Sequence, residues 1–129
     1  MDLIHLTQVV KYEITKKGFI FYDEKGNIPD PSVAYWDGTL SLYDYKGKTL
    51  EGLPGIVDGG LDLSSYNGES LEGLSKIVNG YLWLNSYNGN AFNNLPKEYE
   101  EIFINNKKYT KSEFDDFLKT EKLKSILLD

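Results

Sequence analysis

The sequence contains no cysteine and only one histidine. Without cysteine, the chain cannot form disulfide bonds, cysteine-bound zinc sites or thiol nucleophiles. A single histidine, His5, cannot build a histidine-rich metal site, and no serine motif accompanies it. We therefore expect His5 to have a structural role, and we expect neither a metal nor an organic cofactor.

Arginine is also absent, so all fourteen basic residues are lysine, and the net charge is −6. Arginine supplies the rigid fork that binds phosphates and guanine edges, and a protein that reads nucleic-acid sequence normally uses it. A negative chain is also repelled by a phosphate backbone and by an anionic membrane. Neither nucleic acid nor membrane is therefore an expected direct ligand.

Long hydrophobic runs are missing as well. No segment approaches the roughly 18 consecutive apolar residues of a membrane span. Residues 1–7 lack the basic and apolar regions of a secretion signal. The hydrophobic and charged fractions, 40% and 26%, are ordinary for globular proteins, and 129 residues suit one domain. These features predict a single cytoplasmic domain.

What the sequence does contain is a repeat of 21 residues, found in at least three copies. Each copy has a Leu-x-Leu pair, then a Tyr-x-Gly segment, then a pair of apolar residues three positions apart. The matching positions are Leu40, Leu61 and Leu82; Leu42, Leu63 and Leu84; Tyr45, Tyr66 and Tyr87; Gly47, Gly68 and Gly89; Leu50, Leu71 and Phe92; and Leu53, Leu74 and Leu95. A unit this short cannot bury its own apolar face, so the copies must stack as a solenoid.

The spacing within one copy predicts the structure of a coil. The Leu-x-Leu pair alternates with polar residues, which is typical of a short strand with its leucines facing inward. Tyr66-Asn67-Gly68 and its counterparts predict a turn, because Asn-Gly favours positive φ. Strands of successive coils should pair in parallel, about 4.8 Å apart. The stacked tyrosines are expected to stabilise neighbouring coils rather than to bind a ligand.

Two segments resemble the leucine-rich and leucine-rich-like solenoid repeats of bacterial and phage proteins. They are Leu61-x-Leu63-x-x-Tyr66 with Leu71-x-x-Leu74, and Leu50-x-x-Leu53-Pro54-x-Ile56 in the preceding copy. The resemblance covers residues 38–98. It departs from the usual pattern where tyrosine replaces the turn asparagine and where Asn-Gly lengthens the coil. The resemblance implies a scaffold for protein recognition more often than an enzyme.

Both ends of a stack of coils must be closed, and the sequence suggests how. Residues 8–15, a turn at Lys17-Gly18 and residues 19–21 predict an N-terminal hairpin, and 19–37 align as a degenerate first coil before the solenoid of residues 38–105. Ile102-Phe103-Ile104 predicts a last strand, displaced by about one residue. Residues 110–129, which open with a Thr110–Glu113 capping box, predict one or two short helices that cover the C-terminal end. Their expected apolar stripe comprises Phe114, Phe117, Leu118, Leu123, Ile126 and Leu127.

A search for catalytic motifs yields little. The glycines in Asp58-Gly59-Gly60 lie at repeat positions and match no nucleotide-binding spacing. Asp37, Asp58 and Asp62 are acidic residues that solenoid stacking brings near one another, and paired carboxylates can hydrolyse polysaccharides. Acidic residues at solenoid turns are normally just solvated, so we expect no enzyme and keep a carbohydrate-processing solenoid as an alternative.

Strand alternation gives one hypothesis at the level of residues. With the leucines inward, Ser41, Asp62, Trp83 and Phe103 form a row on the outer face, flanked by Tyr43 and Tyr81. These outward positions differ from copy to copy, and they place large aromatics at the surface, as interface hot spots do. The expected partner-binding residues are Tyr43, Asp62, Tyr81, Trp83 and Phe103. The alternative is that the N-terminal hairpin covers this face.

Negative charge is concentrated in the coils. Residues 37–104 contain ten acidic residues and four lysines, whereas the rest of the chain is balanced. This distribution suits a basic protein partner. We expect a non-enzymatic acidic protein-binding module, for example a phage or bacterial counter-defence inhibitor, similar in role to an anti-CRISPR, that acts on a basic nucleic-acid-binding protein. The alternatives are carbohydrate binding and structural assembly, including self-association through open solenoid ends.

Overall fold

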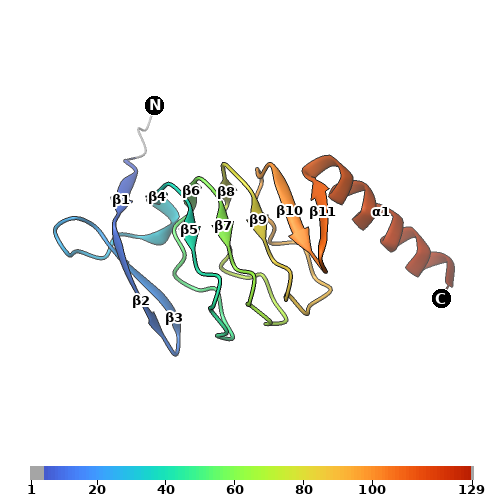
Figure 1. Ribbon diagram of the computed structural model, residues 1–129, viewed down its shortest axis with the longest axis horizontal. Coiled ribbons are helices and arrows are strands. Elements are labelled where there is room, and N and C mark those ends of the chain that lie inside the picture. Colours follow the sequence, from blue (N-terminus) through green and yellow to red (C-terminus); the bar gives the residue numbers. More distant parts are fainter. Residues whose placement is uncertain (1–4, 129) are drawn as a thin grey trace.

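The computed structural model describes residues 5–128, which form a mainly β protein. Its centre is a parallel β-solenoid of about three turns, with a hairpin at the N-terminal end and one helix at the C-terminal end (Figure 1). The predicted fold class is confirmed. Within this part of the chain, no helix combines the length and the apolar character needed to cross a membrane.

The coils stack through two ladders of short strands, in which all neighbours are parallel except β10 and β11. The first ladder contains β1 (Thr7–Val9), β4 (Ala34–Asp37), β6 (Ile56–Asp58) and β8 (Ile77–Val78) in that order. The second ladder contains β5 (Leu40–Ser41), β7 (Leu61–Asp62), β9 (Leu82–Trp83), β10 (Glu101–Ile104) and β11 (Lys107–Thr110). A 3₁₀ turn, η1 (Pro31–Val33), precedes β4.

The repeat leucines line the inside of the coils, as predicted. Leu40, Leu61 and Leu82 pair across the second ladder, and Ile102 follows them with the expected one-residue slip. All of these side chains are buried, as are the second leucines of each Leu-x-Leu pair. The buried residues form one cluster that runs from Val9 to Phe114. The burial of each apolar side chain against its counterparts in the neighbouring coils therefore holds the coils together.

The tyrosines of the repeat form a second internal ladder. The ring centroids of Tyr45, Tyr66 and Tyr87 are 6.2 and 6.3 Å apart, and the rings are nearly parallel. Each hydroxyl donates a hydrogen bond to the carbonyl four residues later, at 2.5 to 2.6 Å. Burial raises the pKa of all three phenols. These contacts support the predicted structural role.

The glycine of each Tyr-x-Gly segment is required by the tyrosine, not by the backbone angle. A Cβ atom at Gly47, Gly68 or Gly89 would overlap the ring of the tyrosine two residues earlier, and none of the three has a positive φ. The prediction of a left-handed Asn-Gly turn is therefore wrong. The β-turn lies just before each tyrosine, where the Tyr66 amide donates to the Leu63 carbonyl at 3.1 Å.

The predicted N-terminal hairpin is confirmed and consists of β2 (Lys11–Thr15) and β3 (Gly18–Tyr22). The prediction that residues 19–37 form a degenerate coil is wrong, because β3 pairs antiparallel with β2 and does not join the second ladder. The strand that extends the stack is β1, which pairs in parallel with β4. The hairpin covers the end of the first coil, where the Phe19 ring lies 4.6 Å from that of Tyr45.

The C-terminal edge of the second ladder is closed by a strand that the sequence analysis did not predict. β11 pairs antiparallel with β10 across a two-residue turn, Asn105-Asn106, in which both φ values are positive. This is the geometry that hairpin loops of two residues favour. The helix α1 (Lys111–Leu128) follows directly, and the predicted capping box is confirmed, since Thr110 and Glu113 exchange hydrogen bonds of 2.8 and 3.1 Å.

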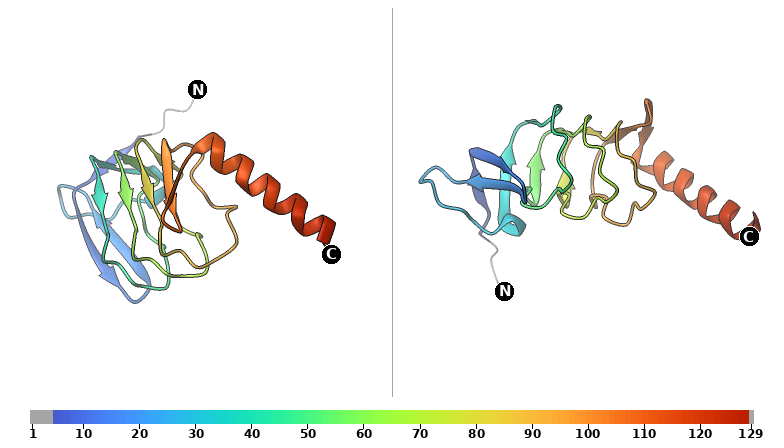
Figure 2. Two further views of the ribbon diagram at one scale, coloured as in Figure 1. Left: turned by 45° about the vertical axis from the view of Figure 1, so that its right-hand side comes forward. Right: turned by 90° about the horizontal axis from the view of Figure 1, so that it is seen from below.

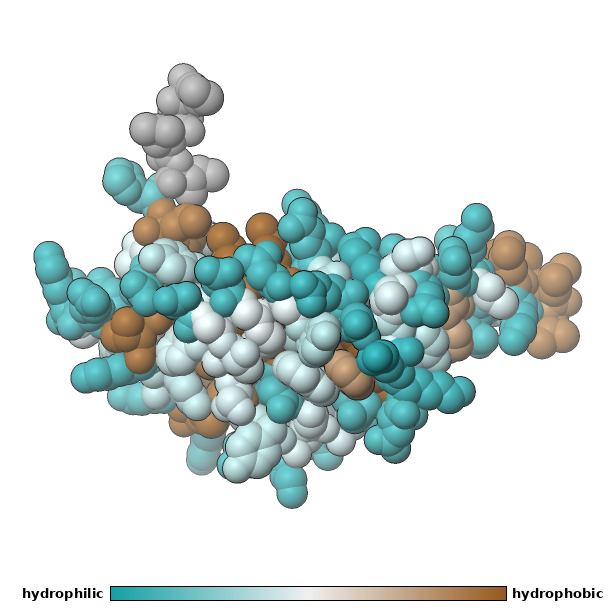
Figure 3. All heavy atoms as spheres, turned by 45° about the horizontal axis from the view of Figure 1, so that its top comes forward, coloured by the Kyte–Doolittle hydropathy of each residue, from teal (hydrophilic) through white to brown (hydrophobic). Residues whose placement is uncertain are grey.

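The predicted C-terminal helical cap is confirmed, and the first half of α1 forms it. Phe114 is buried, but Leu123, Ile126 and Leu127 are exposed, and the helix projects away from the coils (Figure 2). Leu123 lies nine residues after Phe114, which at about 100° per residue places it on the opposite face. The prediction that these residues form one apolar stripe is therefore wrong. Figure 3 shows the hydrophobic side chains gathered at the far end of the helix.

Candidate functional site

The predicted outward row exists on the second ladder. Ser41 pairs with Asp62, Asp62 with Trp83 and Trp83 with Phe103, so the four residues lie side by side on consecutive strands. The β11 strand extends the row by Lys108, which pairs with Phe103. The strands that position these residues are pinned by buried leucines on their other face, so the row is carried on a rigid support.

Three of the predicted residues form one aromatic cluster, Tyr81, Trp83 and Phe103. The Trp83 and Phe103 rings are stacked with centroids 5.6 Å apart, and Tyr81 meets both rings edge-on at 5.8 and 5.9 Å. Tyr81 is 39% exposed, and the other two side chains are partly buried. An exposed aromatic group on a rigid sheet is the kind of surface that protein interfaces use.

The N-terminal hairpin does not cover this cluster. Its rings contact Trp36 and Tyr45 of the first coil, and Figure 1 shows the hairpin at the end of the stack, away from β9 and β10. The alternative in which the hairpin buries the outward row is therefore wrong. The cluster belongs to the last coils, two strands from the hairpin end of the ladder.

Tyr43 lies apart from the aromatic cluster. It is 60% exposed in the turn that follows β5, and no ring contact joins it to Tyr81, Trp83 or Phe103 in the part of the chain described. Of the five predicted binding residues, the structure thus brings four together and leaves Tyr43 separate.

Asp62 is held next to the cluster by its own turn. Its Oδ1 accepts hydrogen bonds from the amide and the hydroxyl of Ser64, at 3.0 and 2.5 Å. The neighbouring Gly60 makes room for Trp83, because a Cβ atom there would lie 2.8 Å from the indole Cζ3. The indole therefore extends from β9 toward Gly60, which directly precedes β7, the strand of Asp62.

The acidity of the coils lies mostly at the surface. Of the ten acidic residues between Asp37 and Ile104, eight are exposed, while Asp62 and Glu101 are partly buried. Glu101 pairs with Lys108 at 3.4 Å and is the one member of this set with a lysine partner among residues 5–128. The coils therefore present a largely uncompensated negative surface.

The three aspartates considered for catalysis do not converge. Asp37 and Asp58 pair across β4 and β6 on the first ladder, where the Asn79 amide donates to Asp58 Oδ1 at 2.9 Å. Asp62 belongs to the other ladder. Across the described residues, no three histidine, cysteine, aspartate or glutamate side chains are grouped as a metal site requires, and His5 is exposed.

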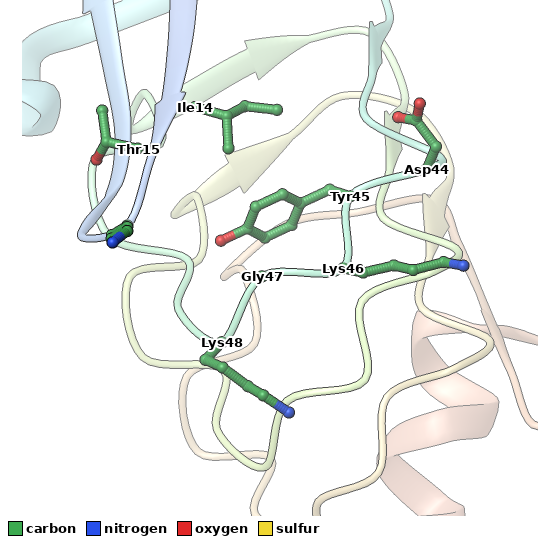
Figure 4. Close-up of a pocket in the computed structure, with 8 residues that line it drawn as sticks. Ile14, Thr15, Asp44, Tyr45, Lys46, Gly47 and Lys48 are labelled. Carbon is green, nitrogen blue, oxygen red and sulfur yellow. The ribbon is translucent and has the colours of Figure 1, made fainter.

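A shallow pocket of 460 Å³ lies between the hairpin turn and the first coil. Ile14 and Thr15 line one side, and the buried Tyr45 ring lies opposite (Figure 4). Three lysines line the pocket, Lys16, Lys46 and Lys48, and the last two point away from the Tyr45 ring. The sequence analysis did not predict this pocket, because it depends on how the hairpin docks.

Several residues that shape the aromatic site were also missed. Gly60 and Ser64 occupy outward positions at which the copies differ, so the repeat pattern gave no signal of their roles beside Trp83 and Asp62. Lys108 was missed with strand β11, because β11 (Lys-Lys-Tyr-Thr) is mostly polar and only the Asn105-Asn106 pair, of a residue type that tolerates positive φ, indicates a turn. Searches of protein-family models, of curated proteins and of solved structures found no significant match to this chain.

Proposed function

We propose that this chain is a non-enzymatic protein-binding module that engages its partner through the aromatic cluster. The observation that carries the proposal is the partly exposed group of Tyr81, Trp83 and Phe103 on a rigid ladder. The first coil has Thr39 and Ser41 at the positions of Tyr81 and Trp83, so coil folding does not require aromatics there. Exposed aromatics that the fold does not need point to binding.

The negative surface of the coils supports a basic partner. Eight exposed acidic residues without lysine partners attract positive charge and speed the encounter with a basic protein. A nucleic-acid-binding protein has such a surface, and the coils would compete there with nucleic acid. A counter-defence inhibitor of bacterial or phage origin is the most concrete form of this proposal.

The test compares binding by variants that restore the residues of the first coil. Trp83→Ser and Tyr81→Thr each insert the residue that the first coil carries at the same position, two coils away, so folding should be retained. Tyr43→Ser is the matched control, because it removes an exposed tyrosine outside the cluster and inserts the equivalent residue, Ser64. Circular dichroism checks that all three variants are folded.

The immobilised protein is used to capture partners from a lysate of the source cells at low and high salt. We expect Trp83→Ser and Tyr81→Thr to lose a retained protein that wild type and Tyr43→Ser both hold, and we expect high salt to weaken its retention. Capture by the folded Trp83→Ser variant that equals that of wild type would contradict the proposal. Quenching of Trp83 fluorescence by sugars would instead favour the carbohydrate alternative.

A further inference from the structure

The aromatic cluster and Asp62 together have the composition of a site for a positive group. Phe103 covers one side of the Trp83 indole, and the edge of the indole rests on Gly60, where a side chain would otherwise stand. The indole therefore lies on the side of β9 that adjoins β7, the strand of Asp62, which pairs directly with Trp83. An indole face carries negative electrostatic potential and attracts cations.

The carboxylate beside the indole is unbalanced. Both hydrogen bonds to Asp62 come from Ser64 and end on Oδ1, which leaves Oδ2 as a free acceptor among the described contacts. No lysine pairs with Asp62 in residues 5–128, whereas Glu101, the other carboxylate next to the cluster, is neutralised by Lys108. The carboxylate and the indole face therefore attract the same kind of ligand, a positive group.

We infer that Asp62, Trp83 and Tyr81 form a site for the side chain of an arginine on the protein partner. The inference rests on the proposed function, since it names the chemistry that the binding face recognises. The planar guanidinium stacks on the exposed aromatic surface and donates an N–H to Oδ2 of Asp62. Arginine suits this site better than lysine, because its flat, weakly hydrated group stacks on rings while it donates hydrogen bonds in its own plane.

The test uses a probe that requires no partner, N-acetyl-L-argininamide, at constant total ionic strength. Binding is followed by the shift of the Trp83 indole N–H signal in two-dimensional NMR, and a Trp36→Phe variant assigns the two indole signals. The neutral analogue N-acetyl-L-citrullinamide has nearly the same shape without the charge. We expect a saturable shift with the arginine probe and none with the citrulline probe.

Substitutions then locate the site. Asp62→Asn should raise the apparent Kd for the arginine probe by about 2- to 5-fold, as the loss of one surface ion pair predicts. Asp37→Asn removes the same charge from the first ladder and should leave the Kd unchanged. Equal shifts from both probes, or equal effects of the two aspartate substitutions, would overturn the inference. Tighter binding of N-acetyl-L-lysinamide would overturn the choice of arginine.

The outcome is separable from that of the proposed function. If the arginine probe gives no shift while Trp83→Ser still abolishes partner capture, the arginine site is wrong and the protein-binding face stands. If the probe binds as expected but Trp83→Ser captures the partner like wild type, the cation site exists and the proposed function fails.

Discussion

The close approach of each repeat tyrosine to its glycine can be tested by a double-mutant cycle at Tyr45 and Gly47. Gly47 has no positive φ, so an alanine there is not strained by the backbone. The obstacle is the ring of Tyr45, whose hydroxyl and adjacent ring carbons occupy the place of a Cβ atom. Gly47→Ala should therefore destabilise the protein by about 1–3 kcal/mol, the usual cost of overpacking.

Removing the ring should reverse the sign of this effect. Tyr45→Leu keeps an apolar group in the core but frees the space over Gly47, at a cost of about 2 kcal/mol for the lost ring atoms and the lost bond to the Thr49 carbonyl. In that background, Gly47→Ala should stabilise by about 0.4–1 kcal/mol, because alanine restricts the unfolded chain. The expected coupling energy is the difference, roughly 1.5–4 kcal/mol.

Urea unfolding of the four proteins, followed by circular dichroism, measures this coupling. Gly73→Ala is the matched control: Gly73 has φ +93°, and its Cβ atom would meet the backbone of Leu50. Its cost should be the same with and without the Tyr45 ring. If Gly47→Ala costs the same in both backgrounds, the glycine is needed for the backbone and our explanation of the Tyr-x-Gly segment is refuted.

Two further predictions concern buried hydroxyls. Ser75 is buried with no partner for its hydroxyl among the described residues, and Pro54 and Pro96 hold the equivalent positions in the neighbouring copies. We expect Ser75→Ala to raise the melting temperature, and Ser75→Pro to raise it further because proline also restricts the unfolded chain. A lower melting temperature for both variants would contradict this prediction. Burial, and secondarily Asp115, raises the pKa of Tyr99 from 10.0 to about 12. The contribution of the neutral Tyr99 phenol to stability is fully present below pH 10 and is lost as the pH rises from 10 through 12. In chemical unfolding, the free energy of unfolding of Tyr99→Phe should therefore fall less than that of wild type across this pH range. Equal losses for the two proteins would show that Tyr99 does not contribute.

The repeat predicts the coil well because each matching position is set by burial against its own copies. Leu61 meets Leu40 on one side and Leu82 on the other, so one period fixes both the strand register and the inward face. The same reasoning fails at the ends, where there is no copy to match. Phe19 aligns with Leu40 in sequence, yet its strand turns back on β2, because a hairpin satisfies its backbone without another coil.

The helix shows a second limit of pattern reasoning. Its capping box is local, and the hydrogen bonds between Thr110 and Glu113 could be predicted from four residues. Which face of α1 packs against the coils depends on the position and direction in which the helix leaves the stack. Since contact ends after the first turns, Leu123 and Leu127 have no partner to select their face, and their apolar character does not predict burial.

The candidate site was predicted from the outward positions at which the repeat copies differ, and the structure shows which of these residues lie together. Outward residues of a solenoid are free of packing constraints, so a large aromatic there must either be covered or serve another purpose. Tyr43 and Trp83 are indistinguishable by this criterion in the sequence. Geometry separates them, because Trp83 lies on a ladder between Phe103 and Asp62, whereas Tyr43 lies in a turn with no ring contact to the cluster among residues 5–128. A partner that loses affinity for Trp83→Ser and keeps it for Tyr43→Ser would therefore be recognised by the cluster as a unit, not by exposed aromatic surface in general.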